Sequence, residues 1–341
     1  MNDATGGAPV TPERLMKMAW AHAAPLSIEA GIRLGIFDTL NGQEKTAEQI
    51  ASDTKCSLRG TTVLLNLLAG FGFLEKSARN TYQLTPESDT FLVSTKPSFQ
   101  GGIFRHISEQ LMPKWLHLTE VVRTGEPAAN VSGESDGSVF FEKFVEDIFP
   151  MSYPAAHALA GALGLAESKQ TVSVLDLAAG SGVWGIALAQ ASPKVKVRAV
   201  DWPTVLEVTK RGAAKFGLAD RFTFGPGDLL EADFGSGHQL ATLGHILHSE
   251  GEKRSILLLE KAFKALAPGG TIAIAEFLVN EDRTGPMNGL IFAMNMLVNT
   301  PEGNTYSFEE IRNWLQKTGF EHVRQLDVPG PSPLILADRP A

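Results

Sequence analysis

The sequence predicts an α/β protein in which a helical N-terminal part is followed by a doubly wound parallel sheet with helices on both faces. Three observations lead to this prediction. Apolar residues recur at helical spacing up to about residue 95. From Thr171 onward, short apolar strands alternate with helical stretches, and a glycine-rich turn, "AAGSGVWG", follows the first strand. Strands that alternate with helices along the chain are typical of a parallel sheet covered on both faces.

The N-terminal part has the element order of a winged helix. "LSIEAGIRLGIFDTL" and "TTVLLNLLAGFGFLE" carry helical spacing, and between them Thr46 precedes Gln49 as an N-cap. "FLEKSARNTYQLT" predicts two short strands around a polar turn. The helix in the DNA-reading position, residues 58–70, carries a single charge, Arg59, so we expect a packing surface there and no DNA binding.

Composition narrows the class of protein. The chain has 341 residues, of which 43% are hydrophobic, and a formal net charge of -8, which disfavours binding to nucleic acid or anionic lipid. It has no apolar run of about 18 residues or more, and its start, "MNDATGGAPVTPERL", lacks a signal-peptide pattern. Cys56 is the only cysteine, which excludes an intramolecular disulfide and a cysteine-rich zinc site. We expect a soluble, cytoplasmic protein with no metal and no membrane or nucleic-acid partner.

The second half of the sequence predicts a series of strands and the ends of one helix. Apolar "VSVLDLA", "KVRAVD", "FTFGPGD", "LATLGHIL" and "TIAIAEFLV" are the expected strands. A later helix begins with the capping box Ser307 and Glu310 and ends at Gly319. "VRQLDV" and "PLILAD" then follow each other with a short connection, so we expect them to pair antiparallel.

The glycine-rich turn predicts a nucleotide site. Gly180, Gly182 and Gly185 fit the pattern G-x-G-x-x-G, which lets the backbone approach a nucleotide closely at the start of a helix. Asp201 ends the next strand, where a carboxylate can accept both ribose hydroxyls. A dinucleotide and S-adenosylmethionine would both use these features.

Three observations favour S-adenosylmethionine, with S-adenosylhomocysteine as product. Asp176 lies inside the first strand, where a carboxylate repels a pyrophosphate but stabilises a sulfonium and an ammonium. Asp228, in "GPGDLLEADF", lies at the end of the third strand, where it can accept from an adenine amino group. The winged-helix front and the antiparallel closing pair are not features of dinucleotide enzymes.

On these motifs the chain resembles the small-molecule O-methyltransferase family that includes caffeic acid, acetylserotonin and bacterial antibiotic-tailoring methyltransferases. "LDLAAGSG" resembles the family's D-x-G-G-G-x-G loop, "AVDWPTVLE" its second strand and D-L-P turn, "GDLLE" its G-D-M-F segment, and "ALAPGGTIAIAEF" its helix-to-strand turn. The resemblance covers nearly the whole chain. It implies a Rossmann-like methyltransferase sheet with an antiparallel last strand, preceded by a winged-helix dimerisation domain.

The resemblance also implies a domain plan and a cofactor site. Residues 12–95 would form the dimerisation domain, 96–165 a helical linker contributing to the substrate pocket and the dimer, and 166–341 the S-adenosylmethionine-binding catalytic domain. A homodimer would also cover the apolar N-terminal helices. The residues implied to hold the cofactor are Asp176, Gly180, Gly182, Asp201, Trp202, Asp228 and Leu229.

His248 is the expected general base. Methyl transfer to a hydroxyl needs alignment and a better nucleophile, and a neutral histidine can take the proton of a phenol whose pKa is about 10. His248, in "GHILHSEGEK", matches the histidine of the family's H-D-W motif, although Ser249 and Glu250 replace the Asp and Trp. His245 is the alternative. If the strand continues through both, their side chains point to opposite faces, and we expect His245 to be a packed strand histidine.

Glu276 is the expected partner that fixes the tautomer of the histidine. It is a lone carboxylate at the end of an apolar strand, and it matches the family's first acid of this kind. The family's second acid falls at Thr305 in this chain, and Glu302 in the same loop is the alternative. Gly244 stands where relatives often carry a lysine that contacts the cofactor.

The substrate residues are expected on two helices. Phe292, Met296 and Asn299 share a face of "GLIFAMNMLVNT", which resembles the family's substrate-lining helix, although such a stripe can also be plain core. His106, by its spacing from Trp115, falls where relatives place a polar substrate contact; a packed or solvated histidine is the alternative.

The function predicted is a homodimeric S-adenosylmethionine-dependent O-methyltransferase that acts on a small, aromatic, secondary-metabolite-type acceptor. Two alternatives stay open at this point. One is a C- or N-methyltransferase with the same fold and cofactor. The other is a cofactor-binding protein that has lost its chemistry, which the altered H-S-E and Thr305 positions would permit.

Overall fold

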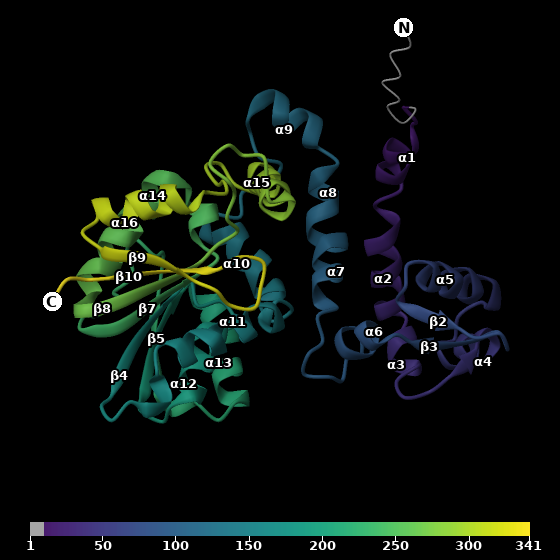
Figure 1. Ribbon diagram of the computed structural model, residues 1–341, viewed down its shortest axis with the longest axis horizontal. Coiled ribbons are helices and arrows are strands. Elements are labelled where there is room, and N and C mark those ends of the chain that lie inside the picture. The colour runs from purple at the N-terminus through teal and green to yellow at the C-terminus, as the bar shows by residue number, and fades with distance from the viewer. Residues whose placement is uncertain (1–9) are drawn as a thin grey trace, which may run out of the picture. The chain divides into compact units, whose positions relative to one another are not determined.

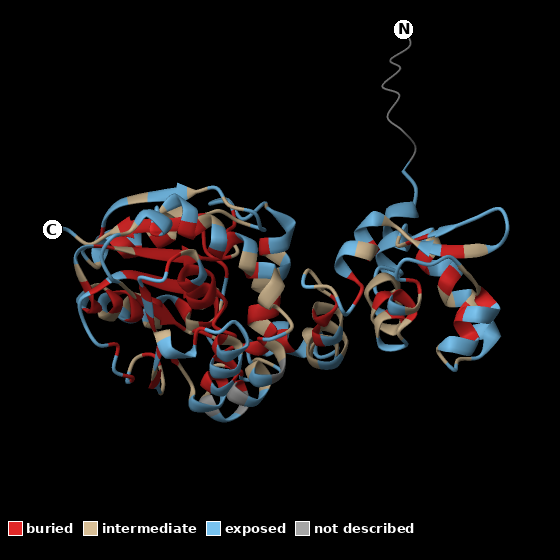
Figure 2. Cartoon of the chain, turned by 90° about the horizontal axis from the view of Figure 1, so that it is seen from below, coloured by how far each residue is buried: buried red, intermediate tan, exposed pale blue. Residues whose placement is uncertain are grey.

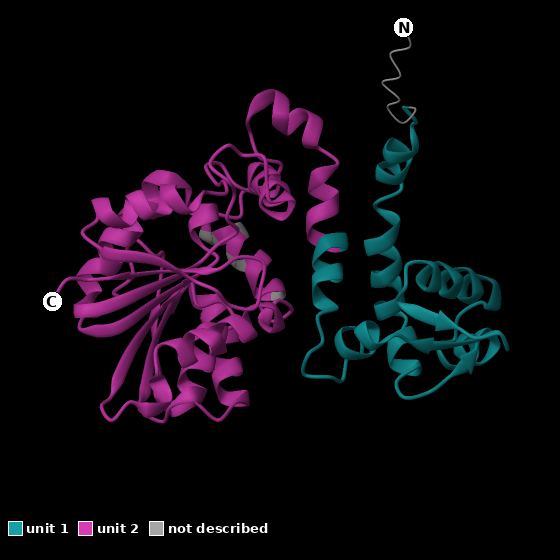
Figure 3. Cartoon of the chain, viewed as in Figure 1, with its two compact units in different colours: residues 1–108 teal, residues 109–341 magenta. Residues whose placement is uncertain are grey.

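The computed structural model describes residues 10–341, except for the side chains at positions 134, 136, 138 and 143. Most of the stretch in which no signal peptide was found, residues 1–9, therefore lies outside the described range. The chain forms two compact units, residues 1–108 and 109–341 (Figure 3). Their boundary falls inside the segment 96–165, and the three-part domain plan stays a prediction.

The first unit has the predicted helix, helix, helix, hairpin order. Thr46 and Gln49 form the expected capping box, which starts α4, and the two predicted strands pair antiparallel as β2 and β3, with β1 added to form the order β1-β3-β2. A separate core that includes Phe37, Leu65 and Tyr82 holds the unit together. Its elements are α1 (Glu13–Ala19), α2 (Ala23–Arg33), α3 (Ile36–Thr39), β1 (Lys45–Thr46), α4 (Ala47–Asp53), α5 (Leu58–Gly70), β2 (Leu74–Lys76), β3 (Thr81–Leu84), α6 (Pro86–Phe91) and α7 (Gly102–His106).

Helix α1 buries none of its residues in the single chain. Leu15, Met16, Met18 and Trp20 are all exposed, the last of them at 67%. A helix with this many exposed apolar side chains needs a partner surface. This is the behaviour expected of a dimerisation element.

The second unit holds the sheet and the helices around it. After a π-helical turn at Ile107–Leu111, the elements are α8 (Met112–Trp115), α9 (Leu118–Thr124), α10 (Glu134–Phe144), α11 (Phe149–Ala162), β4 (Val172–Leu177), α12 (Val183–Ala191), β5 (Val195–Asp201), α13 (Pro203–Lys215), β6 (Phe222–Pro226), β7 (His238–Gly244), α14 (Leu247–Ala265), β8 (Leu266–Ala275), α15 (Met287–Asn299), α16 (Phe308–Lys317), β9 (Glu321–Leu326) and β10 (Leu334–Asp338). Short 3₁₀ turns lie at Leu165–Glu167 and Ala219–Arg221.

The seven strands follow the order β6-β5-β4-β7-β8-β10-β9 (Figure 1). The pairs from β6 to β8 are parallel, while β10 pairs antiparallel with both β8 and β9. The chain leaves β4 toward β5 on one side and β7 toward β8 on the other. The carboxyl ends of β4 and β7 are therefore a topological switch point, where open α/β sheets place their ligands.

Alternating residues of the strands pack into two separate hydrophobic cores, one on each face of the sheet. Figure 2 shows that much of the sheet is buried. Val174 packs on the side of α11, α12 and α13, whereas Leu175 and Leu177 pack on the side of α14 and α16. Ser307 and Glu310 form the predicted capping box of α16. Within the described residues, no helix combines the length and apolarity needed to cross a membrane.

Candidate active site

The glycine-rich turn joins β4 to α12, and its glycines have distinct physical roles. Gly180 and Gly182 have positive φ values of 56° and 77°, which side chains other than glycine rarely adopt. A Cβ at Gly185 would lie 2.8 Å from the Val197 side chain and 2.9 Å from the Asp176 carboxylate. The first two glycines therefore shape the turn, and the third brings α12 close to the sheet.

Asp176 lies beneath the turn and has no exposed surface. Its Oδ2 accepts from the Gly185 N–H at 2.9 Å, and its Oδ1 accepts from the Thr242 hydroxyl at 2.7 Å. Burial raises the pKa of this carboxyl to about 7. The carboxylate thus ties the start of α12 to β7, and its expected cofactor contact stays a prediction.

Asp201, the last residue of β5, lies against the same turn. Its Oδ2 accepts from the Gly180 N–H at 2.8 Å and its Oδ1 from the Trp202 N–H at 2.7 Å. Burial raises the pKa of Asp201 to about 6. The half-buried Trp202 indole packs against Phe141 of α10, with 6.1 Å between ring centroids. The structure therefore places Asp201 and Trp202, two of the expected cofactor residues, side by side at the glycine turn.

Asp228 follows β6, which ends two residues earlier at Pro226. Its carboxylate accepts from the Leu230 N–H at 2.9 Å and from Arg254 of α14 at 3.0 and 3.2 Å. Arg254 in turn donates to Glu250 at 2.6 Å. Sequence reasoning missed this arginine, because only the fold brings α14 next to the segment after β6.

The segment that carries Asp228 is held from a second point on α14. The Lys261 ammonium donates to the backbone oxygens of Leu229, at 2.9 Å, and Ala232, at 2.5 Å. The Leu229 side chain is buried. The structure therefore gives Leu229 a packed position next to Asp228, and its expected cofactor contact stays a prediction.

His248 and Glu276 form the predicted pair. His248 lies in the first turn of α14 and Glu276 directly follows β8; both are nearly buried, with 8% and 3% of their surface exposed. His248 Nδ1 lies 2.7 Å from Glu276 Oε2, and the His248 backbone N–H donates to Oε1 at 3.2 Å. Burial opposes ionisation of Glu276, but its charge interactions with the two histidines and these hydrogen bonds outweigh burial and lower its pKa.

His245 does not continue the strand, so the expectation that it is a strand histidine is wrong. β7 ends at Gly244, and His245 has a left-handed φ of 62°. Its ring centroid lies 6.5 Å from that of His248 and 5.1 Å from that of Phe277. Burial lowers its pKa to about 4, and its Nδ1 is buried without a hydrogen-bond partner. The two histidines are therefore neighbours and not on opposite faces.

Two phenylalanines pack against the histidine pair. Phe292 of α15 meets the His248 ring edge to face at a centroid distance of 4.8 Å. Phe277 lies 4.1 Å from Phe292 by the same measure. Phe292 was expected from the sequence, whereas Phe277 was missed; its position directly after Glu276 is the signal that would have found it.

The other two expected residues of α15, Met296 and Asn299, are buried. The Asn299 amide donates to the Asn295 backbone oxygen at 2.9 Å, and Asn295 Oδ1 accepts from the Trp115 indole at 3.0 Å. Asn299 Oδ1 is buried without a partner. This polar group links α8 to α15, and sequence reasoning missed Asn295, the residue at its centre.

Within the described residues, no hydrogen bond or ion pair joins either candidate for a second acid to the His248 side chain. The Thr305 hydroxyl is buried and donates to the Gly289 backbone oxygen at 3.2 Å. Glu302 is exposed, and its loop approaches α14 through backbone, where the Asn304 N–H donates to the His248 oxygen at 2.8 Å. Within the described residues, Glu276 is thus the carboxylate that holds the imidazole.

His106 belongs to the first unit, where it is buried at the end of α7. Its predicted substrate contact stays a prediction. Among the side chains that the structure describes, no group of three His, Cys, Asp or Glu is arranged to hold a metal ion.

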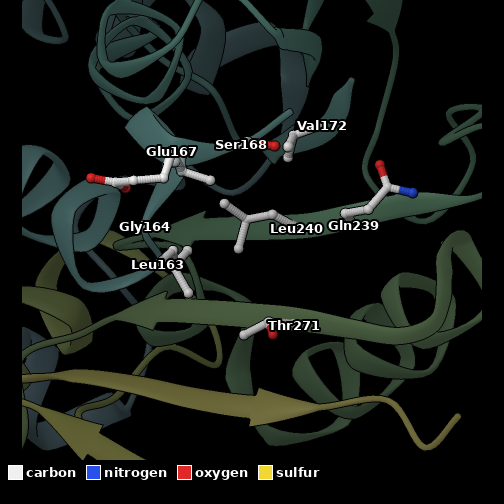
Figure 4. Close-up of a pocket in the computed structure, with 9 residues that line it drawn as sticks. Leu163, Gly164, Glu167, Ser168, Val172, Gln239, Leu240 and Thr271 are labelled. Carbon is white, nitrogen blue, oxygen red and sulfur yellow. The ribbon is translucent and has the colours of Figure 1, made fainter. Parts of the chain in front are cut away.

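A pocket of about 320 Å³ lies where the parallel strands begin, at the end of the sheet opposite the glycine turn (Figure 4). It opens beside Leu163 and Glu167, next to the first residues of β4 and β7, represented by Val172 and Gln239. The glycine turn, Asp201 and His248 all lie at the carboxyl ends of the strands. The pocket is therefore separate from the candidate active site.

Comparison with known families gives two matches along the chain. The O-methyltransferase domain matches residues 115–321, and the O-methyltransferase dimerisation domain matches residues 16–94. The first match alone covers more than half of the chain. Together they confirm the predicted family resemblance and the homodimer.

Three similar proteins support the same assignment. A 3-hydroxy-5-methyl-1-naphthoate 3-O-methyltransferase of Streptomyces sahachiroi is 29% identical over 89% of this chain and 88% of its own length. The S-adenosyl-L-methionine-dependent methyl transferase PigF of Serratia sp. is 28% identical over 90% of each chain. A solved structure from Nostoc punctiforme, assigned as an O-methyltransferase, has a TM-score of 0.89 and 28% identity over 97% of this chain and 100% of that one.

These matches also confirm the fold class, since the similar structure shares the doubly wound sheet and the N-terminal helical domain over almost the whole chain. The match to the catalytic domain extends from α8 to the start of β9, and so includes the glycine turn, the His248–Glu276 pair and α15. The chain belongs to the O-methyltransferase family.

Proposed function

We propose that this enzyme transfers a methyl group from S-adenosylmethionine to a hydroxyl of a small aromatic acceptor, with His248 as the general base. The observation that carries the proposal is the 2.7 Å contact between His248 Nδ1 and Glu276 Oε2. Because the carboxylate accepts a hydrogen bond, the proton of the neutral imidazole lies on Nδ1. The lone pair of Nε2 is then free to accept the proton of the acceptor hydroxyl.

The residues at the glycine turn fit S-adenosylmethionine. Gly180 and Gly182 keep side chains off the turn, so backbone can approach a ligand. Asp201 has a second lone pair on each carboxylate oxygen for the ribose hydroxyls, and Asp228 can accept from the adenine amino group. The bound cofactor supplies an electrophilic methyl carbon on a positively charged sulfur.

The protein contributes a base, a counter-charge and a dry site. His248 Nε2 takes the hydroxyl proton as the oxygen–carbon bond forms and the carbon–sulfur bond breaks. The resulting imidazolium is stabilised by Glu276, whose lowered pKa keeps it ionised near neutral pH. Phe277 and Phe292 exclude water from the imidazole and offer flat apolar surfaces.

An aromatic acceptor is supported from two sides. The histidine pair is lined by aromatic rings of Phe277 and Phe292, which suit a planar substrate. The relative from Streptomyces sahachiroi is named for a hydroxylated naphthoate. We place the reaction in the cytoplasm, where a chain with Cys56 as its single cysteine needs no disulfide.

The test is transfer of labelled methyl from S-adenosylmethionine to a panel of phenols, enolisable keto acids and amines, followed by mapping of the product. We expect label on a phenolic oxygen, and a loss of about 10²-fold or more in turnover for His248→Ala with S-adenosylhomocysteine binding retained. Label on carbon or nitrogen alone, or full turnover by the variant, would contradict the proposal.

A further inference from the structure

We propose that the indole N–H of Trp184 binds the carboxylate of the methionine part of S-adenosylmethionine. This proposal rests on the cofactor assignment above. It assigns a contact that determines specificity to Trp184. This residue of the sequence "GSGVWG" otherwise belongs to the hydrophobic core.

Trp184 reaches across the topological switch point. It is the second residue of α12, directly after the glycine turn, and its ring lies against Gly244, the last residue of β7. A Cβ at Gly244 would collide with the indole Nε1 and would lie 3.0 Å from Cε2. Any larger residue at position 244 would therefore displace the indole, so the two residues form a matched pair.

The indole N–H is a donor without a protein partner. No hydrogen bond among the described side chains involves it. It is also not one of their fully enclosed polar atoms that lack a partner, which are Thr61 Oγ1, His245 Nδ1 and Asn299 Oδ1. The side chain as a whole is 4% exposed. Because a buried indole N–H normally finds a hydrogen-bond partner, an open one at the carboxyl ends of β4 and β7 points to a ligand acceptor.

The chemistry of the neighbouring groups indicates which acceptor this is. The cofactor carries one anionic group, its carboxylate, besides hydroxyls, an amino group and two positive charges. Asp201 and Asp228 accept hydrogen bonds and so suit the ribose and adenine. The start of α12 offers unpaired backbone N–H groups and the positive end of the helix dipole. Trp184 adds a side-chain donor at the same helix start, so the carboxylate is the cofactor group that fits it.

The test compares two ligands that differ only in that carboxylate: S-adenosylhomocysteine and its decarboxylated analogue. Their dissociation constants are measured by titration calorimetry for the wild type, Trp184→Phe and a matched control, Trp314→Phe, which changes a buried tryptophan of α16 on the other face of the sheet. We expect Trp184→Phe to weaken S-adenosylhomocysteine about tenfold, as for loss of a hydrogen bond to a charged group. The analogue should bind the wild type and Trp184→Phe equally well, and Trp314→Phe should change neither constant.

A second variant covers the case in which Trp184→Phe does not fold. Gly244→Ala keeps the indole but pushes it from its position, and should give the same carboxylate-selective loss. Equal weakening of both ligands, or no weakening of either, overturns the proposal, because Trp184 would then only pack. If the wild type binds neither ligand, the cofactor assignment itself fails, which is a distinguishable result.

Discussion

His248 Nδ1 lies 2.7 Å from Glu276 Oε2, although the two residues are 28 positions apart and lie after different strands. β7 and β8 are parallel neighbours, so their carboxyl ends bring the two side chains together. Glu276 also accepts from the His248 backbone N–H, which fixes the start of α14 as well as the ring. The pair is therefore a single unit in which the acid sets both the position and the tautomer of the base.

Replacing Glu276 by Gln removes the charge that stabilises the imidazolium. We expect Glu276→Gln to lower turnover by about 10²-fold, because an amide can present an N–H to Nδ1 and favour the wrong tautomer. S-adenosylhomocysteine affinity should change little. The exposed Glu281, in the loop after β8, gives a matched control, Glu281→Gln. Full turnover by Glu276→Gln would show that the acid is dispensable.

We predict that His245 has a structural role and is not the general base. Asn tolerates the left-handed backbone found at this position, so His245→Asn should fold and keep methyl transfer within a few-fold of the wild type. His248→Asn should lose about 10²-fold or more. Steady-state turnover of the two variants with one acceptor decides the assignment, and a larger loss at His245 would reverse it.

The depressed pKa of His245 also predicts a pH effect on stability. In the unfolded chain a histidine titrates near 6.5, whereas burial lowers the folded pKa to about 4. Between these values the unfolded state binds more protons, so His245 reduces the free energy of unfolding as the pH falls from 6.5 to 4. His245→Asn should remove this contribution. As the pH falls from 6.5 to 4, the melting temperature of His245→Asn relative to that of the wild type should therefore rise steadily. A difference that stays constant would contradict the burial of a neutral ring.

Asp176 predicts the opposite slope. Its folded pKa is raised to about 7, while an unfolded Asp titrates near 3.8. Between these values the folded state binds more protons, so the contribution of this carboxyl to stability is lost as the pH rises from about 4 through 7. Asp176→Asn removes the titrating group. The melting temperature of the wild type relative to this variant should therefore fall over that range, and a parallel pH dependence would exclude the raised pKa.

Arg254 is expected to act through Asp228. Its guanidinium contacts both carboxylate oxygens and orients them, so Arg254→Ala should weaken S-adenosylhomocysteine binding about threefold, as expected for a partly exposed ion pair. Arg312, which pairs with Glu309 at similar exposure on α16, provides the control Arg312→Ala. Equal affinities for both variants and the wild type, measured by calorimetry, would mean that Asp228 needs no support.

Much of this fold was accessible from local sequence. The capping boxes at Thr46 and Ser307, the hairpin and the antiparallel closing strands depend on neighbouring residues, and the structure has each of them. The His248–Glu276 pair was predicted from the match of both residues to the family's motifs, and it forms because both follow strands that end at the same side of the sheet.

The remaining features depend on contacts between distant segments. The Trp184 ring lies against Gly244 at the end of β7, and His245, directly after it, has a left-handed backbone. Asp176 accepts from the Thr242 hydroxyl of the neighbouring strand, a contact that no local pattern predicts, and its expected cofactor contact stays a prediction. The Arg254–Asp228 contact likewise joins two segments that no local pattern connects.

The pH dependence of the His248→Ala deficit tests the central claim most directly. A general base is needed only while the acceptor hydroxyl is protonated, and an unperturbed phenol loses its proton near pH 10. Single-turnover rates of wild type and variant with one phenolic acceptor should therefore differ by about 10²-fold or more at pH 7 and converge as the pH approaches 10. A deficit that stays constant across this range would contradict the account, because His248 would then position the acceptor without removing its proton.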